Sequence, residues 1–123
     1  MGGHIQTFRD LTAWQKGHAL VLMVHEMIQI FPKHEQYALS NQLWRAVVSI
    51  TSNIAEGFRR ESYKDKAHFY TMSLSSLSEI QNQLLIARDV GYINTETFMQ
   101  IANQTVEVSK LLKGLIKATK RHF

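Results

Sequence analysis

The sequence contains no cysteine, one proline and six glycines, and it has no apolar run of the roughly 20 residues that a membrane span requires. The lack of cysteine excludes disulfides and thiolate metal sites and fits a reducing compartment. Because proline and glycine are scarce, long helices are favoured over many short strands. The N-terminus also lacks the basic-then-apolar layout of a secretory signal, so we expect a cytoplasmic protein with no membrane partner.

The composition is that of a globular protein. Of the 123 residues, 45% are hydrophobic and 20% are charged, which is enough apolar material for one core but a short chain for two. We expect a flexible N-terminal segment over residues 1–10 and a single domain over residues 11–123.

Apolar residues recur at steps of three and four in four successive segments. Such spacing places them on one face of an α-helix, and in the second segment these residues are Leu43, Val47, Ile50 and Ile54. The segments cover residues 11–30, 38–56, 63–90 and 94 or 95 onward. Because the links between them are short, the pattern predicts an all-α fold, an antiparallel up-down-up-down four-helix bundle.

Local signals mark the predicted helix ends. Pro32 stops the first helix, because the residue before a proline is pushed out of helical geometry. Gly57 occupies the position of a left-handed C-terminal cap for the second helix, and Gly91 closes the third. Ser62 and Asp65 resemble a capping box, so the third helix is expected to begin near Tyr63.

The first predicted helix has more apolar surface than one seam needs. A second stripe lies beside its main seam, which predicts that the helix buries two sides. We expect this stripe to form part of an interface between copies of the chain, because it would otherwise expose a large apolar patch. Its residues are Leu20, Met23, Met27 and Ile30.

A polar stripe runs along the second predicted helix and consists of Arg45, Ser49, Asn53 and Glu56. Arg45 and Glu56 are three turns apart, so each is expected to reach a neighbouring helix or subunit, and Glu79 is a candidate partner for Arg45. The favoured interpretation is a structural network that fixes helix register or subunit contact. The alternative is a ligand-binding or catalytic face. No sequence motif places a general base and an orienting group beside any of the serines, so nucleophilic catalysis has no support.

Positive charge is concentrated at the C-terminus. The net charge is +4 and no acidic residue follows Glu107. Four lysines lie on one side of the last helix over about 15 Å, and the link between the second and third helices adds two arginines. Such a surface attracts phosphates; the alternative is a solvated face whose cations match the helix dipole. The candidate nucleic-acid-binding residues are Lys110, Lys113, Lys117, Lys120, Arg121, Arg59 and Arg60.

The histidines predict no metal site. His18 and His25 are seven residues apart on one helix, about 10 Å along its axis, which is too far to share an ion without other ligands. If Met1 were removed, Gly2-Gly3-His4 would offer copper or nickel a square-planar ligand set, but we interpret it as a tail.

The order of the motifs resembles one protein family along nearly the whole chain. The matching residues are Trp14, Phe31-Pro32 with Glu35, Gln42, Arg45-Ala46, Ser49-Ile50, the run Asn53-Ile54-Ala55-Glu56-Gly57 with Arg59 or Arg60 behind it, Ser76 with Glu79, and Gly91-Tyr92-Ile93. This pattern resembles the four-helix-bundle proteins encoded in intervening sequences of bacterial 23S ribosomal RNA genes. Their relatives include the accessory variability protein of diversity-generating retroelements.

The resemblance implies a homopentameric ring of bundles, no cofactor and no established enzymatic activity. In the retroelement relatives it implies a basic surface that engages nucleic acid and a reverse transcriptase. We do not extend the reverse-transcriptase partnership to this chain, because it depends on a neighbouring gene.

Three hypotheses for function follow. The first is a self-assembling module whose basic surface binds RNA or DNA non-specifically. The second is a structural or protein-interaction scaffold whose charge serves solubility. The third is an enzyme that uses the face of Arg45, Asn53 and Glu56, and the sequence favours it least.

Overall fold

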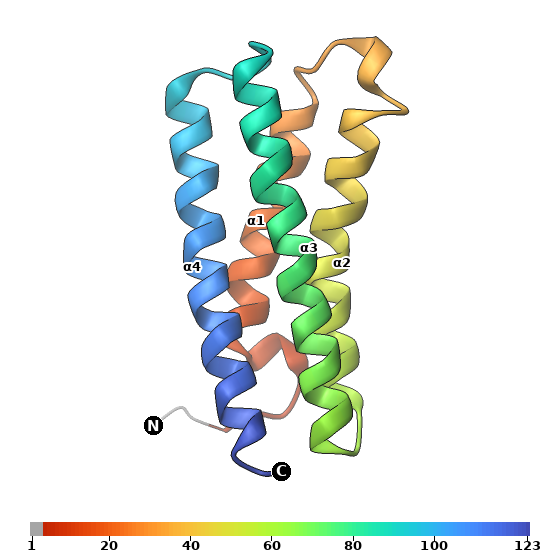
Figure 1. Cartoon of the computed structure of the whole chain (residues 1–123), viewed down its shortest axis with the longest axis vertical. Helices are drawn as coiled ribbons and strands as arrows, with labels where there is room; N and C mark the ends of the chain where they lie inside the picture. The colour runs from red at the N-terminus through yellow and green to blue at the C-terminus, as the bar shows by residue number, and fades with distance from the viewer. Residues whose placement is uncertain (1–3) are drawn as a thin grey trace.

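The computed structural model describes residues 4–123, and these residues form four long helices with no strand among them. The helices are α1 (Thr12–Ile28), α2 (Leu39–Arg59), α3 (Tyr63–Asp89) and α4 (Thr95–Lys120), with short 3-10 turns η1 (Phe8–Asp10) and η2 (Lys33–Glu35). Each helix packs against the next, and α1 also packs against α4. Successive helices run in opposite directions in Figure 1. The predicted all-α four-helix bundle is confirmed.

The helix starts follow the local chemistry. The Ser62 hydroxyl accepts a hydrogen bond from the backbone N–H of Asp65 at 3.1 Å, and the Asn94 side chain accepts one from Thr97 at 2.8 Å. Both satisfy donors that a helix start leaves free. Gly91 follows α3 with a φ of +86°, a left-handed conformation that glycine adopts without strain.

The prediction that Gly57 is a left-handed C-terminal cap of the second helix is wrong. Gly57 lies inside α2, which continues to Arg59, and Gly91 is the glycine with positive φ among the described residues. A Cβ built on Gly57 would lie 2.7 Å from Tyr70 Cε1 and 3.1 Å from Phe69 Cβ. The glycine therefore lets the Tyr70 ring of α3 pack directly on the α2 backbone.

The core runs along the centre of the bundle and takes apolar residues from every helix. The three- and four-residue spacing of the sequence places them there. The largest side chains with almost no exposed surface are Leu20, Val24, Leu43, Val47, Ile50, Ile54, Leu77, Ile80, Leu84, Val108 and Leu112.

The second stripe of α1 does not form one outward face. Leu20 and Met27 are buried within the bundle, Met23 is half-buried, and Ile30 is 67% exposed just beyond the end of the helix. The prediction that Leu20 and Met27 lie between copies of the chain is therefore wrong. The outer face of α1 instead presents Leu22, which is 57% exposed.

The N-terminal residues include an ordered turn. Residues 1–3 lie outside the described residues, so Gly2-Gly3-His4 is only partly covered. Residues 8–10, expected in a flexible segment, form η1, and Thr7 caps this turn through a capping box with Asp10. The Phe8 ring then meets the Trp14 ring edge-to-face at 5.6 Å.

A hydrogen bond joins the two links at the opposite end of the bundle. The Tyr92 hydroxyl donates to Glu35 Oε2 at 2.6 Å, and the Leu39 backbone N–H donates to the same carboxylate at 3.3 Å. The Tyr92 hydrogen bond is the larger cause that lowers the pKa of Glu35 below its ordinary 4.5, and the Leu39 bond adds to it.

This contact predicts a pH dependence of stability. A depressed carboxyl pKa stabilises the folded state above the unfolded pKa, and that contribution is lost as pH falls through the folded pKa. We expect Tyr92→Phe to lower the free energy of unfolding at pH 7, and the deficit to shrink as pH falls below 4.5. Urea unfolding across this range measures it.

The matched control is Tyr37→Phe, since the Tyr37 side chain is 87% exposed. This control should leave the pH profile of stability unchanged. A Tyr92→Phe deficit that stays constant with pH would show that the hydrogen bond does not depend on the Glu35 charge.

Candidate functional site

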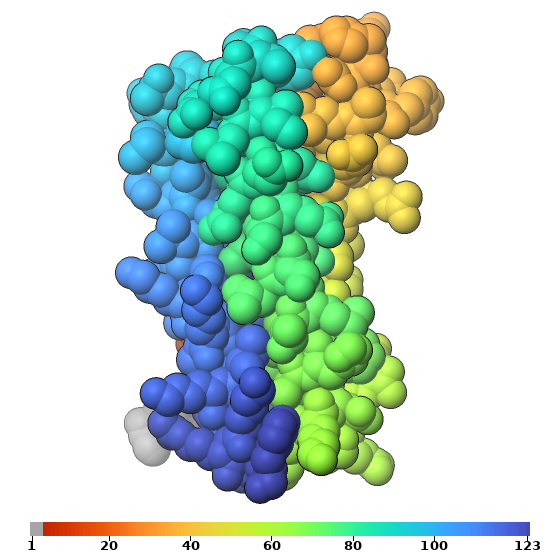
Figure 2. Space-filling model, viewed as in Figure 1, coloured from red at the N-terminus to blue at the C-terminus, as the bar shows by residue number. Residues whose placement is uncertain are grey.

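The predicted basic residues gather at one end of the bundle. The end of α4 and the link between α2 and α3 lie together at one end of the bundle, the end at which the C-terminus lies in the view of Figure 1. All seven predicted phosphate-binding side chains, on α4, at its C-terminus and in this link, are exposed. The space-filling view shows the C-terminal turns of α4 beside the start of α3 on this end (Figure 2).

Charge is separated along the bundle axis. The half that contains this end consists of residues 4–20, 49–76 and 108–123, and we call it the basic half. It holds eleven of the fourteen lysine and arginine side chains and four of the ten carboxylates, a formal side-chain charge of +7. The remaining residues, 21–48 and 77–107, form the acidic half, with three cations and six carboxylates and a formal charge of −3.

Some cations of the basic half already have partners. Arg60 pairs with Glu56 at 3.2 Å, one helical turn away, and its guanidinium lies 4.5 Å from the Phe69 ring centroid. Lys66 donates to the carbonyl of Phe58 at 2.6 Å, which caps the end of α2, and burial lowers the pKa of Lys66. Lys66 is therefore a structural lysine.

A hollow of about 470 Å³ lies between η1 and the end of α2. The residues that line it include two aromatic residues and two arginines, Phe8, Phe58, Arg9 and Arg59, beside Gln6 and Thr7. Arg59 also lies over the Phe8 ring at 5.6 Å. Sequence reasoning missed this hollow, because nothing in the pattern of residues 4–10 shows that they fold back onto α2.

The polar stripe of α2 divides into two groups instead of forming one network. The Ser49 hydroxyl lies 3.0 Å from that of Ser76 on α3, and the Asn53 amide donates to both the carbonyl and the hydroxyl of Ser49. Short polar residues thus join α2 to α3. Glu56 points elsewhere, to Arg60.

Arg45 does not pair with Glu79, its candidate partner from the sequence. Both side chains are exposed, and no ion pair joins them within residues 4–123. They line a hollow of about 460 Å³ between α2 and α3, together with Gln83, whose Oε1 is buried without a hydrogen-bond partner. Because Arg45 is exposed, its removal would leave no buried unpaired charge, so it is not a buried structural anchor.

The residues that line this hollow do not include a matched general acid and general base. Its walls contain one carboxylate, that of Glu79, and no histidine. General acid–base chemistry needs a proton donor and acceptor in reach of one another, and Ser49 and Ser76 here have only each other and Asn53.

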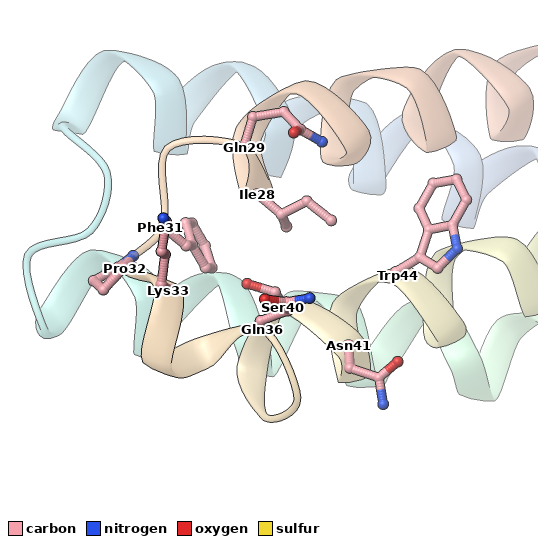
Figure 3. Close-up of a pocket in the computed structure, with 9 residues that line it drawn as sticks. All are labelled: Ile28, Gln29, Phe31, Pro32, Lys33, Gln36, Ser40, Asn41 and Trp44. Carbon is pink, nitrogen blue, oxygen red and sulfur yellow. The ribbon is translucent and has the colours of Figure 1, made fainter.

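A further hollow of about 380 Å³ lies between the end of α1, the following link and the start of α2. Figure 3 shows Trp44 at one end of it and Phe31 and Pro32 at the other. The ionisable side chain in its walls is Lys33. Its other walls are apolar residues, amides and one hydroxyl, and this set with a single cation does not define a reaction.

The histidines form no cluster. Among residues 4–123 no three His, Asp or Glu side chains are placed to hold a metal ion. His18 instead stacks on Trp14 with ring centroids 4.8 Å apart, and His25 contacts Trp44 at 5.5 Å. In the same part of the chain no helix is long and apolar enough to cross a membrane.

Comparison with known proteins identifies the family. Residues 9–114 match the model of the 23S rRNA-intervening sequence protein family. The chain therefore belongs to this family.

A solved structure shares the fold. The crystal structure of a protein of unknown function from the S23 ribosomal protein family of Bacteroides thetaiotaomicron VPI-5482 superposes with a TM-score of 0.78 at 24% sequence identity. The match covers 85% of this chain and 95% of that one. The comparison with curated proteins found no match. The relation to the accessory variability protein of retroelements stays a prediction.

Proposed function

We propose that this chain is a self-assembling helical module that presents its basic end to RNA or DNA and binds phosphates without reading sequence. The observation that supports this most is the charge separation, +7 in the basic half against −3 in the acidic half. A phosphate backbone is attracted to such an end and repelled by the opposite one. The name of the family, which refers to 23S rRNA, agrees with a nucleic-acid context.

The chemistry of this end favours backbone contacts over base reading. The lysines of α4, Lys110, Lys113, Lys117 and Lys120, occupy exposed positions of one helix where each can meet a phosphate, and such contacts carry no base-sequence information. Affinity of this kind comes mainly from released counterions, so it falls steeply with salt.

Exposed apolar side chains on two opposite faces support self-assembly. Leu22 and Trp44 lie on the face of α1 and α2, whereas Leu85, Met99 and Val106 lie on the face of α3 and α4. When two different faces of the same chain pair, the contact is head-to-tail, and it closes into a ring if the rotation allows. We propose a ring of five, as the family resemblance implies, in which all basic ends share one side.

Charge reversal tests nucleic-acid binding. We expect Lys117→Glu/Lys120→Glu to weaken binding of labelled RNA and duplex DNA, and to lower the salt slope by about one unit for each phosphate that the protein no longer neutralises. Fluorescence anisotropy across a salt series measures both. The matched control is Lys33→Glu in the acidic half of the bundle, which should bind as the unmodified chain does.

Two results would contradict the proposal. If the unmodified protein binds neither nucleic acid at low salt, the basic end is not a binding surface and the scaffold hypothesis replaces it. If sedimentation shows a monomer at every concentration, the assembly part fails, whatever the binding result.

A further inference from the structure

We infer that the hollow between η1 and the end of α2 takes one unpaired nucleotide, so that the basic end prefers single-stranded nucleic acid to a duplex. This inference rests on the proposed function and names the class of nucleic acid. It depends on the combination of aromatic rings and free guanidinium groups in that one place.

The wall formed by η1 is held in position from both sides. The Asp10 carboxylate accepts hydrogen bonds from the backbone N–H groups of Gln6 and Thr7, both at 2.9 Å. On the other side the Phe8 ring packs against Trp14 at 5.6 Å. The turn therefore presents Phe8 to the hollow as a fixed surface.

The two arginines of the hollow have no carboxylate partner among the described residues. Of the three acids nearest in sequence to these arginines, two are already occupied, and the third, Glu61, forms no ion pair within residues 4–123. Asp10 binds the backbone of η1, and these same hydrogen bonds lower its pKa, whereas Glu56 pairs with Arg60. Arg9 and Arg59 therefore have no anionic partner among the described residues and can bind an anion from outside the chain, Arg59 from its position 5.6 Å from the Phe8 ring centroid.

An aromatic ring beside a free guanidinium group suits a nucleotide. A base stacks on an aromatic side chain whatever its identity, while arginine binds the adjacent phosphate. The hollow of about 470 Å³ is within the size range of small-ligand sites. A base in a duplex is already paired and stacked, so it cannot enter.

The test compares an oligouridine with a duplex of the same length in anisotropy titrations. We expect the unmodified protein to bind the single strand more tightly. Phe8→Leu keeps an apolar side chain of similar size but removes the aromatic face, and should weaken single-strand binding by about five- to a hundredfold. Phe8→Tyr should retain the binding, and duplex binding should not change in either variant.

The matched control is Phe98→Leu. Phe98 also lies beneath an arginine, with Arg88 4.7 Å from its ring centroid, but it belongs to the acidic half. This variant should bind both probes as the unmodified protein does. Circular dichroism of each variant shows whether the bundle remains folded.

The outcomes separate the inference from the proposed function. The nucleotide site would be overturned if the unmodified protein bound both probes equally, or if the Phe8→Leu variant bound the single strand as tightly as the unmodified protein does. Either result would leave the proposal of phosphate binding intact. If Phe8→Leu weakened the binding of both probes equally, the nucleotide site would also be overturned, because a stacking site binds unpaired bases alone. If the unmodified protein bound neither probe, both the nucleotide site and the proposed function would be overturned.

Discussion

Leu20→Ala should lower the free energy of unfolding by about 2–5 kcal/mol, the largest effect that we expect from a single substitution in this chain. Leu20 has no exposed surface and lies in the core between α1 and its neighbours. Truncation to alanine removes buried methyl groups and leaves a cavity that the packed helices close only in part. Urea unfolding at a fixed protein concentration measures the change.

Leu22→Ala is the matched control, because Leu22 lies two residues further along the same helix and is 57% exposed. Leucine and alanine have similar helix propensities, so below the concentration at which copies assemble through the Leu22 face this substitution should change the stability of the monomeric chain by no more than about 0.5 kcal/mol. If Leu20→Ala left stability unchanged and reduced assembly instead, an interface at Leu20 would be correct and the buried position wrong.

Gly57→Ala should destabilise the fold by about 1–3 kcal/mol, the range for forced overpacking in a core. Alanine is the better helix former by about 1 kcal/mol. At this position the steric term should exceed that gain, because the new Cβ would lie 2.7 and 2.9 Å from two carbons of the Tyr70 ring. To relieve the contact, α2 and α3 must move apart or the buried ring must leave its site.

Gly114→Ala provides the opposite result in the same experiment. Gly114 lies in α4, and a Cβ there meets no atom within 4 Å. Only the propensity term remains, so thermal unfolding should show a gain of about 0.5–1 kcal/mol. A stabilising effect at both glycines would mean that Tyr70 does not pack on the α2 backbone.

Some cations of the basic half stabilise the fold, whereas others are exposed and can bind phosphates. Lys66 belongs to the basic half, yet its ammonium group caps the end of α2 through the Phe58 carbonyl, so charge alone does not identify a binding residue. The variants chosen for binding, at Lys117 and Lys120, lie on exposed positions near the end of α4. They can change phosphate binding without removing a contact that holds the bundle together.

The sequence by itself determined the helices and most of the core. The spacing of Leu43, Val47, Ile50 and Ile54 corresponds to one buried face of α2, and all four are buried. The cap at Ser62 and the turn at Gly91 also follow from the sequence. These features depend on residues one or two turns apart, and local chemistry decides them. The lysine stripe of α4 was predictable for the same reason.

The tertiary structure decided which face of each helix packs against which neighbouring segment of the chain. It placed Leu20 and Met27 in the core, kept Gly57 inside a helix, separated Arg45 from Glu79 and brought Arg9 beside Arg59. Helical period alone cannot distinguish a wide core seam from two separate apolar faces, because both give the same spacing along the chain. Contacts between distant segments depend on how the helices rotate and close against one another, and only the packed bundle determines that.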